Sequence, residues 1–156
     1  PPEYGKYHWD GHRNCNFSCS PNQTKELGGI CPKCGQPLTI GVEYRVNEIA
    51  KYPLGLRAVG SRPYYKILPL HEVLTLYGDK GISSKGNWEI YNNLIEKFDN
   101  EFNILLRVDK QEFLEHGFSE KLTNLIMKNR ISNIKVKPGY DGLYGEAIMS
   151  EQKTLF

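Results

Sequence analysis

The amino-acid sequence predicts an α+β fold, with a small cysteine-rich ribbon followed by a compact domain of short helices and a few-stranded antiparallel sheet or hairpin. All 4 cysteines of the 156-residue chain fall between positions 15 and 34, in a stretch with few helical signals. Further along, apolar residues recur at intervals of three and four, and one late segment alternates apolar with charged residues. The first spacing is that of amphipathic helices and the second that of a half-exposed strand.

Two motifs near the start of the chain have the spacing of metal knuckles. Two residues separate His12 from Cys15, and two separate Cys31 from Cys34 in the sequence Cys-Pro-Lys-Cys-Gly. The proline stiffens this turn and the glycine allows a positive φ, so that two thiolates point at one ion. Because the loop buries too little apolar surface to fold alone, we predict one structural zinc, held by these four residues in a zinc ribbon.

Cys19 leaves an alternative ligand set open. If Cys19 replaces His12, four thiolates hold the ion, and structural zinc accepts this set as well as three thiolates with one imidazole. A pair of disulfides is a further alternative, which the Cys-Pro-Lys-Cys-Gly turn disfavours. Either zinc site is filled by protein ligands, so no catalytic water is expected on the ion. Thiolate ligands require a reducing compartment, and we therefore expect a cytoplasmic protein.

The bulk composition excludes several function classes. No segment is long and apolar enough for a membrane-spanning helix and no signal peptide is visible, so we expect no membrane partner. A net charge of +2 is too small to indicate nucleic-acid binding by itself. The sequence has no phosphate-cradling glycine loop, nucleophile elbow or carboxylate–histidine cluster. We expect no catalytic residue in it and leave open whether the chain is an enzyme.

Three regions are predicted along the chain. They are a zinc ribbon with a trailing helix at 1–52, an α+β domain at 53–150 and a flexible tail at 151–156. Helices are expected at 42–50, 69–78 and 88–98, and after the capping residues Asp109 and Ser119. Strands are expected at 103–108, 134–137 and 143–148.

The predicted nucleic-acid contacts are cations and tyrosines in two segments of the second region. They are Arg62, Tyr64, Tyr65 and Lys66 on a loop, and Lys135 and Lys137 on one side of a strand. On the loop, the cations pair with phosphates while a tyrosine stacks on a base. In the alternative interpretation the tyrosines pack in the core and the cations are merely solvated.

The tail carries a further short pattern. Gln152, Leu155 and Phe156 fit the Q-x-x-L-F pattern that resembles the sliding-clamp-binding peptides of replication and repair proteins. The amide suits a polar subsite and the two apolar side chains suit a groove, so a sliding clamp is a predicted partner. The alternative is a frayed terminus, or a tail that folds back onto its own domain.

Several short motifs follow one another in an informative order. They are Glu3-Tyr4-Gly5-Lys6-Tyr7-His8, the two metal knuckles, Gly41-Val42-x-x-Arg45-Val46-x-Glu48-Ile49-Ala50, Arg62-Pro63-Tyr64, Pro69-Leu70 and Pro138-Gly139-Tyr140-Asp141-Gly142-x-Tyr144-Gly145. In this order they resemble the C-terminal portion of PHP-domain nucleases of the endonuclease Q type, a zinc-binding domain followed by a C-terminal domain.

The resemblance implies a DNA-binding fragment of a DNA repair endonuclease that cleaves 5′ of deaminated or missing bases. It implies that an upstream PHP domain of the same polypeptide supplies the hydrolytic metals, since the family's catalytic motifs have no match here. It also implies a pocket for an extruded base, for which Tyr7, His8 and Tyr140 are candidates. His12 stands where relatives often have a cysteine. The competing interpretation is a zinc-ribbon module that binds protein and makes no nucleic-acid contact.

Overall fold

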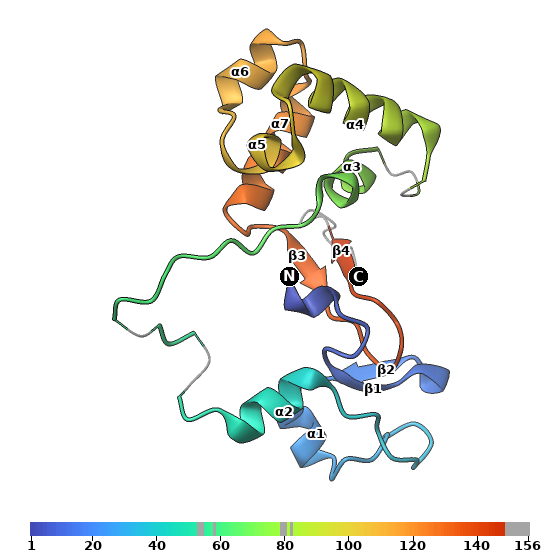
Figure 1. The fold of residues 1–156 in the computed structure, drawn as a ribbon. Coiled ribbons are helices and arrows are strands. Elements are labelled where there is room, and N and C mark those ends of the chain that lie inside the picture. Colours follow the sequence, from blue (N-terminus) through green and yellow to red (C-terminus); the bar gives the residue numbers. More distant parts are fainter. Residues whose placement is uncertain (53–54, 58, 79–80, 82, 149–156) are drawn as a thin grey trace. The chain divides into compact units, whose positions relative to one another are not determined.

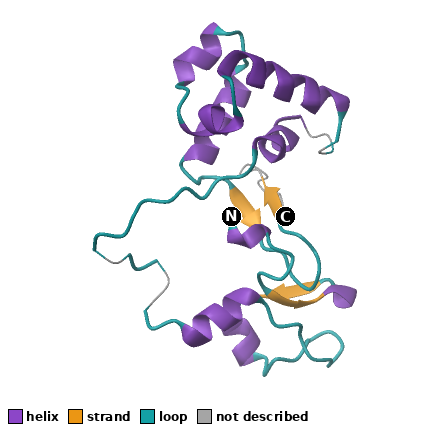
Figure 2. Ribbon diagram, in the orientation of Figure 1, coloured by secondary structure: helices purple, strands orange, loops and turns teal. Residues whose placement is uncertain are grey.

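The computed structural model describes residues 1–52, 55–57, 59–78, 81 and 83–148. The chain divides into two compact units, which we describe separately. The first contains Pro1–Pro63 and Val136–Glu146, and the second contains Tyr64–Lys135 and the chain from Ala147. Both units contain helices, and two small two-stranded sheets complete the mixed α+β fold that the sequence predicts (Figure 2).

Short elements build the first unit. The sheet pairs strand β1 (Asp10–His12) with antiparallel strand β2 (Phe17–Cys19), so that Gly11 lies opposite Ser18. The remaining elements are the 3-10 turns η1 (Pro2–Tyr4) and η2 (Arg13–Cys15) and the helices α1 (Pro21–Glu26) and α2 (Val42–Ile49). Helix α1 begins with a capping box between Ser20 and Gln23, which satisfies two backbone N–H groups.

A buried carboxylate fixes these elements to one another. Asp10 is fully buried, and it accepts hydrogen bonds from Thr24 Oγ1 and from the backbone N–H of Gly41, each at 2.5 Å. Only glycine fits at position 41, because an added Cβ would lie 2.5 Å from the carbonyl oxygen of His8. A buried carboxylate without donors is strongly destabilising, so the network holds β1, α1 and the start of α2 together.

The late segment 136–146 returns to the first unit. It links strand β3 (Lys135–Lys137) to strand β4 (Glu146–Ile148), which form the second sheet (Figure 1). Trp9 donates its backbone N–H to the carbonyl of Gly139 at 2.9 Å, and Gly145 donates to Tyr4 at 3.0 Å. A Cβ at Gly139 would lie 2.5 Å from the carbonyl oxygen of Gly5, so the backbones meet where only glycine fits.

The second unit is helical. Its helices are α3 (Leu70–Gly78), α4 (Lys85–Phe98), α5 (Glu101–Leu106), α6 (Lys110–Glu115) and α7 (Glu120–Arg130). Helices α4 to α7 each begin after a side chain that accepts a hydrogen bond from a backbone N–H, as N-cap residues do. The caps are Ser84, Asn100, Asp109 and Ser119. The buried core includes Leu70, Val73, Leu74, Leu94, Phe98, Ile104, Phe113, Leu122, Leu125 and Ile126.

The strand predicted at 103–108 is wrong, because Glu101–Leu106 forms helix α5. Ile104 and Leu105 are both buried in this helix, and a short apolar run alone does not distinguish a buried strand from a buried helix. Arg130 stabilises the end of α5 by donating hydrogen bonds to the carbonyls of Ile104, Leu105 and Val108 at 3.1, 2.8 and 2.6 Å. The other predicted helices are present, with ends shifted by a few residues.

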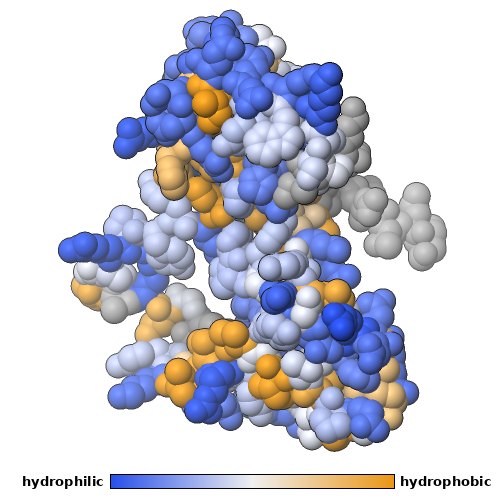
Figure 3. Space-filling model, turned by 45° about the vertical axis from the view of Figure 1, so that its right-hand side comes forward, coloured by the Kyte–Doolittle hydropathy of each residue, from blue (hydrophilic) through white to orange (hydrophobic). Residues whose placement is uncertain are grey.

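Helix α2 forms where the sequence predicts an amphipathic helix, but its apolar side chains are not covered. Val42, Val46 and Ile49 are 60%, 43% and 67% exposed. Hydrophobic side chains are accordingly visible on the surface of the first unit (Figure 3). Among the helices of the described residues, none combines the length and the apolarity that crossing a membrane requires.

Candidate metal centre

Four side chains of the first unit converge to form a candidate metal centre. His12 comes from β1, Cys15 from η2, and Cys31 and Cys34 from the loop after α1. Their ligand atoms all lie within 4.8 Å of one another, and His12 Nδ1 lies 3.2 Å from Sγ of both Cys15 and Cys34. A tetrahedral ion with metal–sulfur bonds of about 2.3 Å separates its sulfurs by about 3.8 Å, so the group has the size of such a site.

A residue with a left-handed backbone conformation directly follows each knuckle. Asn16, which directly follows Cys15, has a φ of 46°, and Gly35, which directly follows Cys34, has a φ of 71°. Left-handed residues reverse the chain after each ligand pair, and asparagine adopts this conformation more readily than most residues other than glycine. In the second knuckle Gly35 donates its N–H to the carbonyl of Cys31 at 2.9 Å. The sequence indicates only the glycine, because asparagine is common outside such turns.

The thiols differ in acidity without an ion. The pKa of Cys15 is raised to about 11, mainly by a hydrogen bond with Cys34 and secondly by burial. Burial raises the pKa of Cys31, but hydrogen bonds from the backbone N–H of Lys33 and from His12 outweigh it and hold this pKa at about 7. A bound divalent cation stabilises thiolates, so it would displace the remaining protons.

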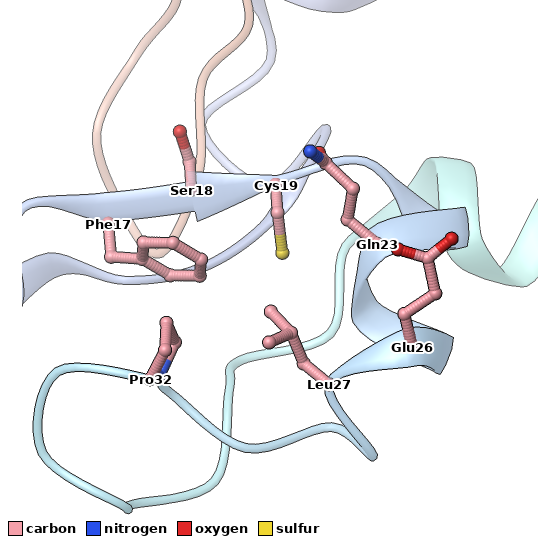
Figure 4. A pocket seen from close by; sticks show the side chains of 7 residues that line it. All are labelled: Phe17, Ser18, Cys19, Gln23, Glu26, Leu27 and Pro32. Carbon is pink, nitrogen blue, oxygen red and sulfur yellow. The ribbon is translucent and has the colours of Figure 1, made fainter.

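Cys19 lies outside this group. It is buried in an apolar cluster with Cys31 and Leu38, and its Sγ lies 3.2 Å from Thr24 Oγ1. Burial raises its pKa, and the hydrogen bond with Thr24 offsets part of this rise. In Figure 4 its sulfur points into a small pocket between Phe17 and Leu27. All four cysteines are free thiols in the structure.

Two residues that carry no local metal-site signal in the sequence support the knuckles. The Asp141 carboxylate accepts hydrogen bonds from the backbone N–H of Arg13 at 2.6 Å and from Thr39 Oγ1 at 2.8 Å. Burial raises the pKa of Asp141, but these hydrogen bonds outweigh it, and the pKa lies below its ordinary value. Lys33 Nζ donates to the carbonyl of Cys15 at 2.9 Å, which links the second knuckle to the first.

The predicted nucleic-acid contacts fall in both units. Arg62 belongs to the first unit and Tyr64 begins the second. Tyr64 and Tyr65 are 72% and 64% exposed, so their rings do not pack in the core. Lys135 and Lys137 are exposed on β3 on either side of half-buried Val136. The nucleic-acid role of these residues stays a prediction.

The three candidates for a base pocket have different surroundings. Tyr7 is exposed, whereas His8 is mostly buried with Nε2 3.3 Å from Glu43 Oε2. Tyr140 is buried, and its hydroxyl donates to Asn16 Oδ1 at 2.9 Å. Their role in base binding stays a prediction. The predicted clamp-binding residues Gln152, Leu155 and Phe156 lie outside the described residues.

Comparison with known sequences finds relatives of greater length. Residues 69–133 match the family model of the MJ0043 C-terminal domain. The chain is 31% identical over 154 residues to the uncharacterized protein MJ0043 of Methanocaldococcus jannaschii. This match covers 98% of the chain but 19% of that protein. The chain thus corresponds to a minor part of that relative.

Comparison with solved structures finds similarity to part of endonuclease Q. The chain is similar to the lesion-specific endonuclease PfuEndoQ of Pyrococcus furiosus, with a TM-score of 0.81 and 27% identity. That match covers 97% of the chain and 37% of PfuEndoQ. A complex of endonuclease Q with a 27-mer duplex carrying an abasic lesion gives a TM-score of 0.77 at 27% identity, covering 96% of the chain and 37% of that protein. The resemblance to part of endonuclease Q that the motifs predict is confirmed.

Proposed function

We propose that the chain is the zinc-binding and DNA-binding part of a DNA repair endonuclease that cleaves 5′ of deaminated or missing bases. In this proposal the hydrolytic metals belong to a PHP domain of the same polypeptide, and the present residues hold DNA for it. The observation that carries the proposal is the similarity to endonuclease Q over 97% of the chain. The chain spans only 37% of that enzyme, so the cleavage activity is assigned to the full-length protein.

Zinc is the ion we propose for the metal centre. Three sulfurs and one imidazole nitrogen form a donor set that zinc prefers over the hard cations calcium and magnesium. Four protein ligands complete a tetrahedral shell, so the ion acts by joining the two knuckles and leaves no position for a reacting water. Free thiols suit a reducing compartment, and we propose the cytoplasm.

The DNA contacts we propose combine charge with exposed rings. Arg62 and Lys66 offer cations to phosphates, while Tyr64 and Tyr65 present rings that are not used in the core. Lys135 and Lys137 add two cations on β3. A titration of the zinc-loaded chain into labelled duplex DNA at increasing salt tests the proposal, because phosphate contacts make affinity fall as salt rises.

A second candidate function is a zinc-ribbon module that binds another protein. The exposed apolar side of α2, with Val42, Val46 and Ile49, favours it, because apolar patches are typical of protein interfaces. This candidate predicts no salt-dependent DNA binding in the same titration. Clamp binding by the tail is a separate proposal, tested by titrating the tail peptide and a Leu155→Ala/Phe156→Ala peptide against a sliding clamp.

A further inference from the structure

The residues of the candidate metal centre differ in their access to solvent. Cys34 is exposed, His12 and Cys15 are half-buried, and Cys31 is only 1% exposed. An oxidant dissolved in water therefore meets the sulfur of Cys34 before that of Cys31. Oxidation of a cysteine starts at an accessible thiolate, and a thiol that coordinates a metal ion is deprotonated. Cys34 is thus the first site of oxidation in this group.

A second sulfur lies beside the exposed one and is free to react with it. The side chains of Cys15 and Cys34 form a hydrogen bond, and both sulfurs lie 3.2 Å from His12 Nδ1. Cys31 also belongs to the group, but its sulfur is fixed by hydrogen bonds from the backbone N–H groups of Lys33 and Cys34 and is buried in an apolar cluster. An oxidised cysteine reacts with a thiol next to it, and Cys15 is the more accessible partner.

We propose that the candidate metal centre is a peroxide-sensitive switch, in which oxidation joins Cys15 to Cys34 and the centre gives up its ion. Cys34 Sγ attacks one oxygen of hydrogen peroxide, the O–O bond breaks, and hydroxide leaves, so that Cys34 becomes a sulfenic acid. Cys15 Sγ then attacks the sulfur of Cys34, the S–O bond breaks, and a second hydroxide leaves. Two thiolates lose two electrons to form one disulfide, and the peroxide gains them to form two hydroxide ions.

The disulfide removes half of the ligand set. Only His12 and Cys31 remain, and two ligands do not complete the tetrahedral shell of a structural zinc, so the centre no longer holds the ion. The two knuckles stay joined, now by the disulfide, and we therefore expect the chain to bind zinc again after reduction. The inference rests on the zinc part of the proposed function, and it adds control of that site by oxidation.

The test treats the zinc-loaded chain with hydrogen peroxide and follows free zinc with a chromogenic indicator. We expect the release of one zinc per chain, together with a decrease in the intact mass by two hydrogen atoms. Peptide mapping is expected to find the bond between Cys15 and Cys34, and a thiol reductant with added zinc is expected to restore the loaded protein. A bond between any other pair of cysteines, or a zinc-loaded chain that keeps its ion under peroxide, overturns the inference.

Two variants separate the exposed thiol from the rest of the site. Cys34→His replaces the thiol by an imidazole, which structural zinc also accepts, so we expect this variant to bind zinc and to keep it under peroxide. Cys19→Ala removes a buried thiol outside the group and is expected to release zinc as the unaltered chain does. Release from Cys34→His at the rate of the unaltered chain overturns the inference. An unaltered chain that binds no zinc would instead overturn the zinc proposal and, with it, the switch.

Discussion

The carboxylate of Asp141 accepts a hydrogen bond from the backbone N–H of Arg13 at 2.6 Å, across 128 positions of sequence. Arg13 directly follows the candidate ligand His12, and Thr39, which donates to the same carboxylate, follows the second knuckle. One side chain of the returning segment 136–146 therefore bonds to the chain next to both knuckles. The metal centre and the late segment form a single structural unit.

We predict that Asp141→Asn destabilises the first unit by about 1–2 kcal/mol. The substitution removes the charge that strengthens two hydrogen bonds and turns an amide N–H₂ toward one of two donors. Urea unfolding of the zinc-loaded protein measures the change. Glu96→Gln, which neutralises an exposed carboxylate on α4, is the control. An equal decrease in the free energy of unfolding in the two variants would contradict a specific role for Asp141.

We predict that Gly139→Ala destabilises the protein by about 1–3 kcal/mol, since an added methyl group must displace packed backbone. Its Cβ would lie 2.5 Å from the carbonyl oxygen of Gly5 and 2.6 Å from the amide nitrogen of Gly145. Gly81→Ala is the matched control, because a Cβ there meets nothing within 4 Å. Thermal unfolding of both variants checks the prediction, which requires a clearly lower Tm for Gly139→Ala alone.

The ligand set predicts opposite outcomes for two single variants. His12→Ala removes a ligand and is expected to lower zinc affinity strongly, whereas Cys19→Ala is expected to keep one zinc per chain. His12→Cys is expected to retain zinc as an all-thiolate site. Metal content after competition with a chelator measures all three. Retention by His12→Ala together with loss by Cys19→Ala would assign the fourth position to Cys19.

Zinc affinity is expected to fall as the pH falls, and more steeply below pH 7 than above it. Zinc binds the thiolate, so binding displaces a proton from any ligand that is protonated. Cys15, with a pKa of about 11, loses a proton to the metal at every pH near neutrality. Cys31, with a pKa of about 7, contributes a further proton only where it is protonated. A slope of log affinity against pH that stays constant through pH 7 would contradict these acidities.

Local signals in the sequence predict much of this molecule. The spacing of His12, Cys15, Cys31 and Cys34 is a property of two tight turns, and the structure brings these four side chains together. Helix α7 is equally local, since Ser119 caps it and its apolar side chains repeat at helical intervals. Signals of this kind depend only on neighbouring residues.

Contacts between distant segments could not be predicted in the same way. No periodicity indicates that Gly139 accepts from Trp9 or that Asp141 accepts from Arg13, because each pairing depends on the finished fold. The short apolar run from Asn103 to Val108 predicts a strand, whereas the chain forms helix α5 over most of it. Asn100 is the local signal that favours the helix, because its side chain caps the helix. The sequence also gives no local signal that the apolar side of α2 is exposed, since its apolar residues are spaced like those of a buried helix face.

A titration of the zinc-loaded chain into labelled duplex DNA carrying an abasic site, at salt from about 50 to 200 mM, decides whether the chain binds DNA. We expect binding whose log affinity falls linearly with log salt. We also expect Arg62→Ala/Lys66→Ala to make this dependence less steep by about 0.9 per lost phosphate contact, while Lys85→Ala/Lys97→Ala on α4 leaves it unchanged. A folded, zinc-loaded chain that binds no DNA even at the lowest salt would contradict this expectation.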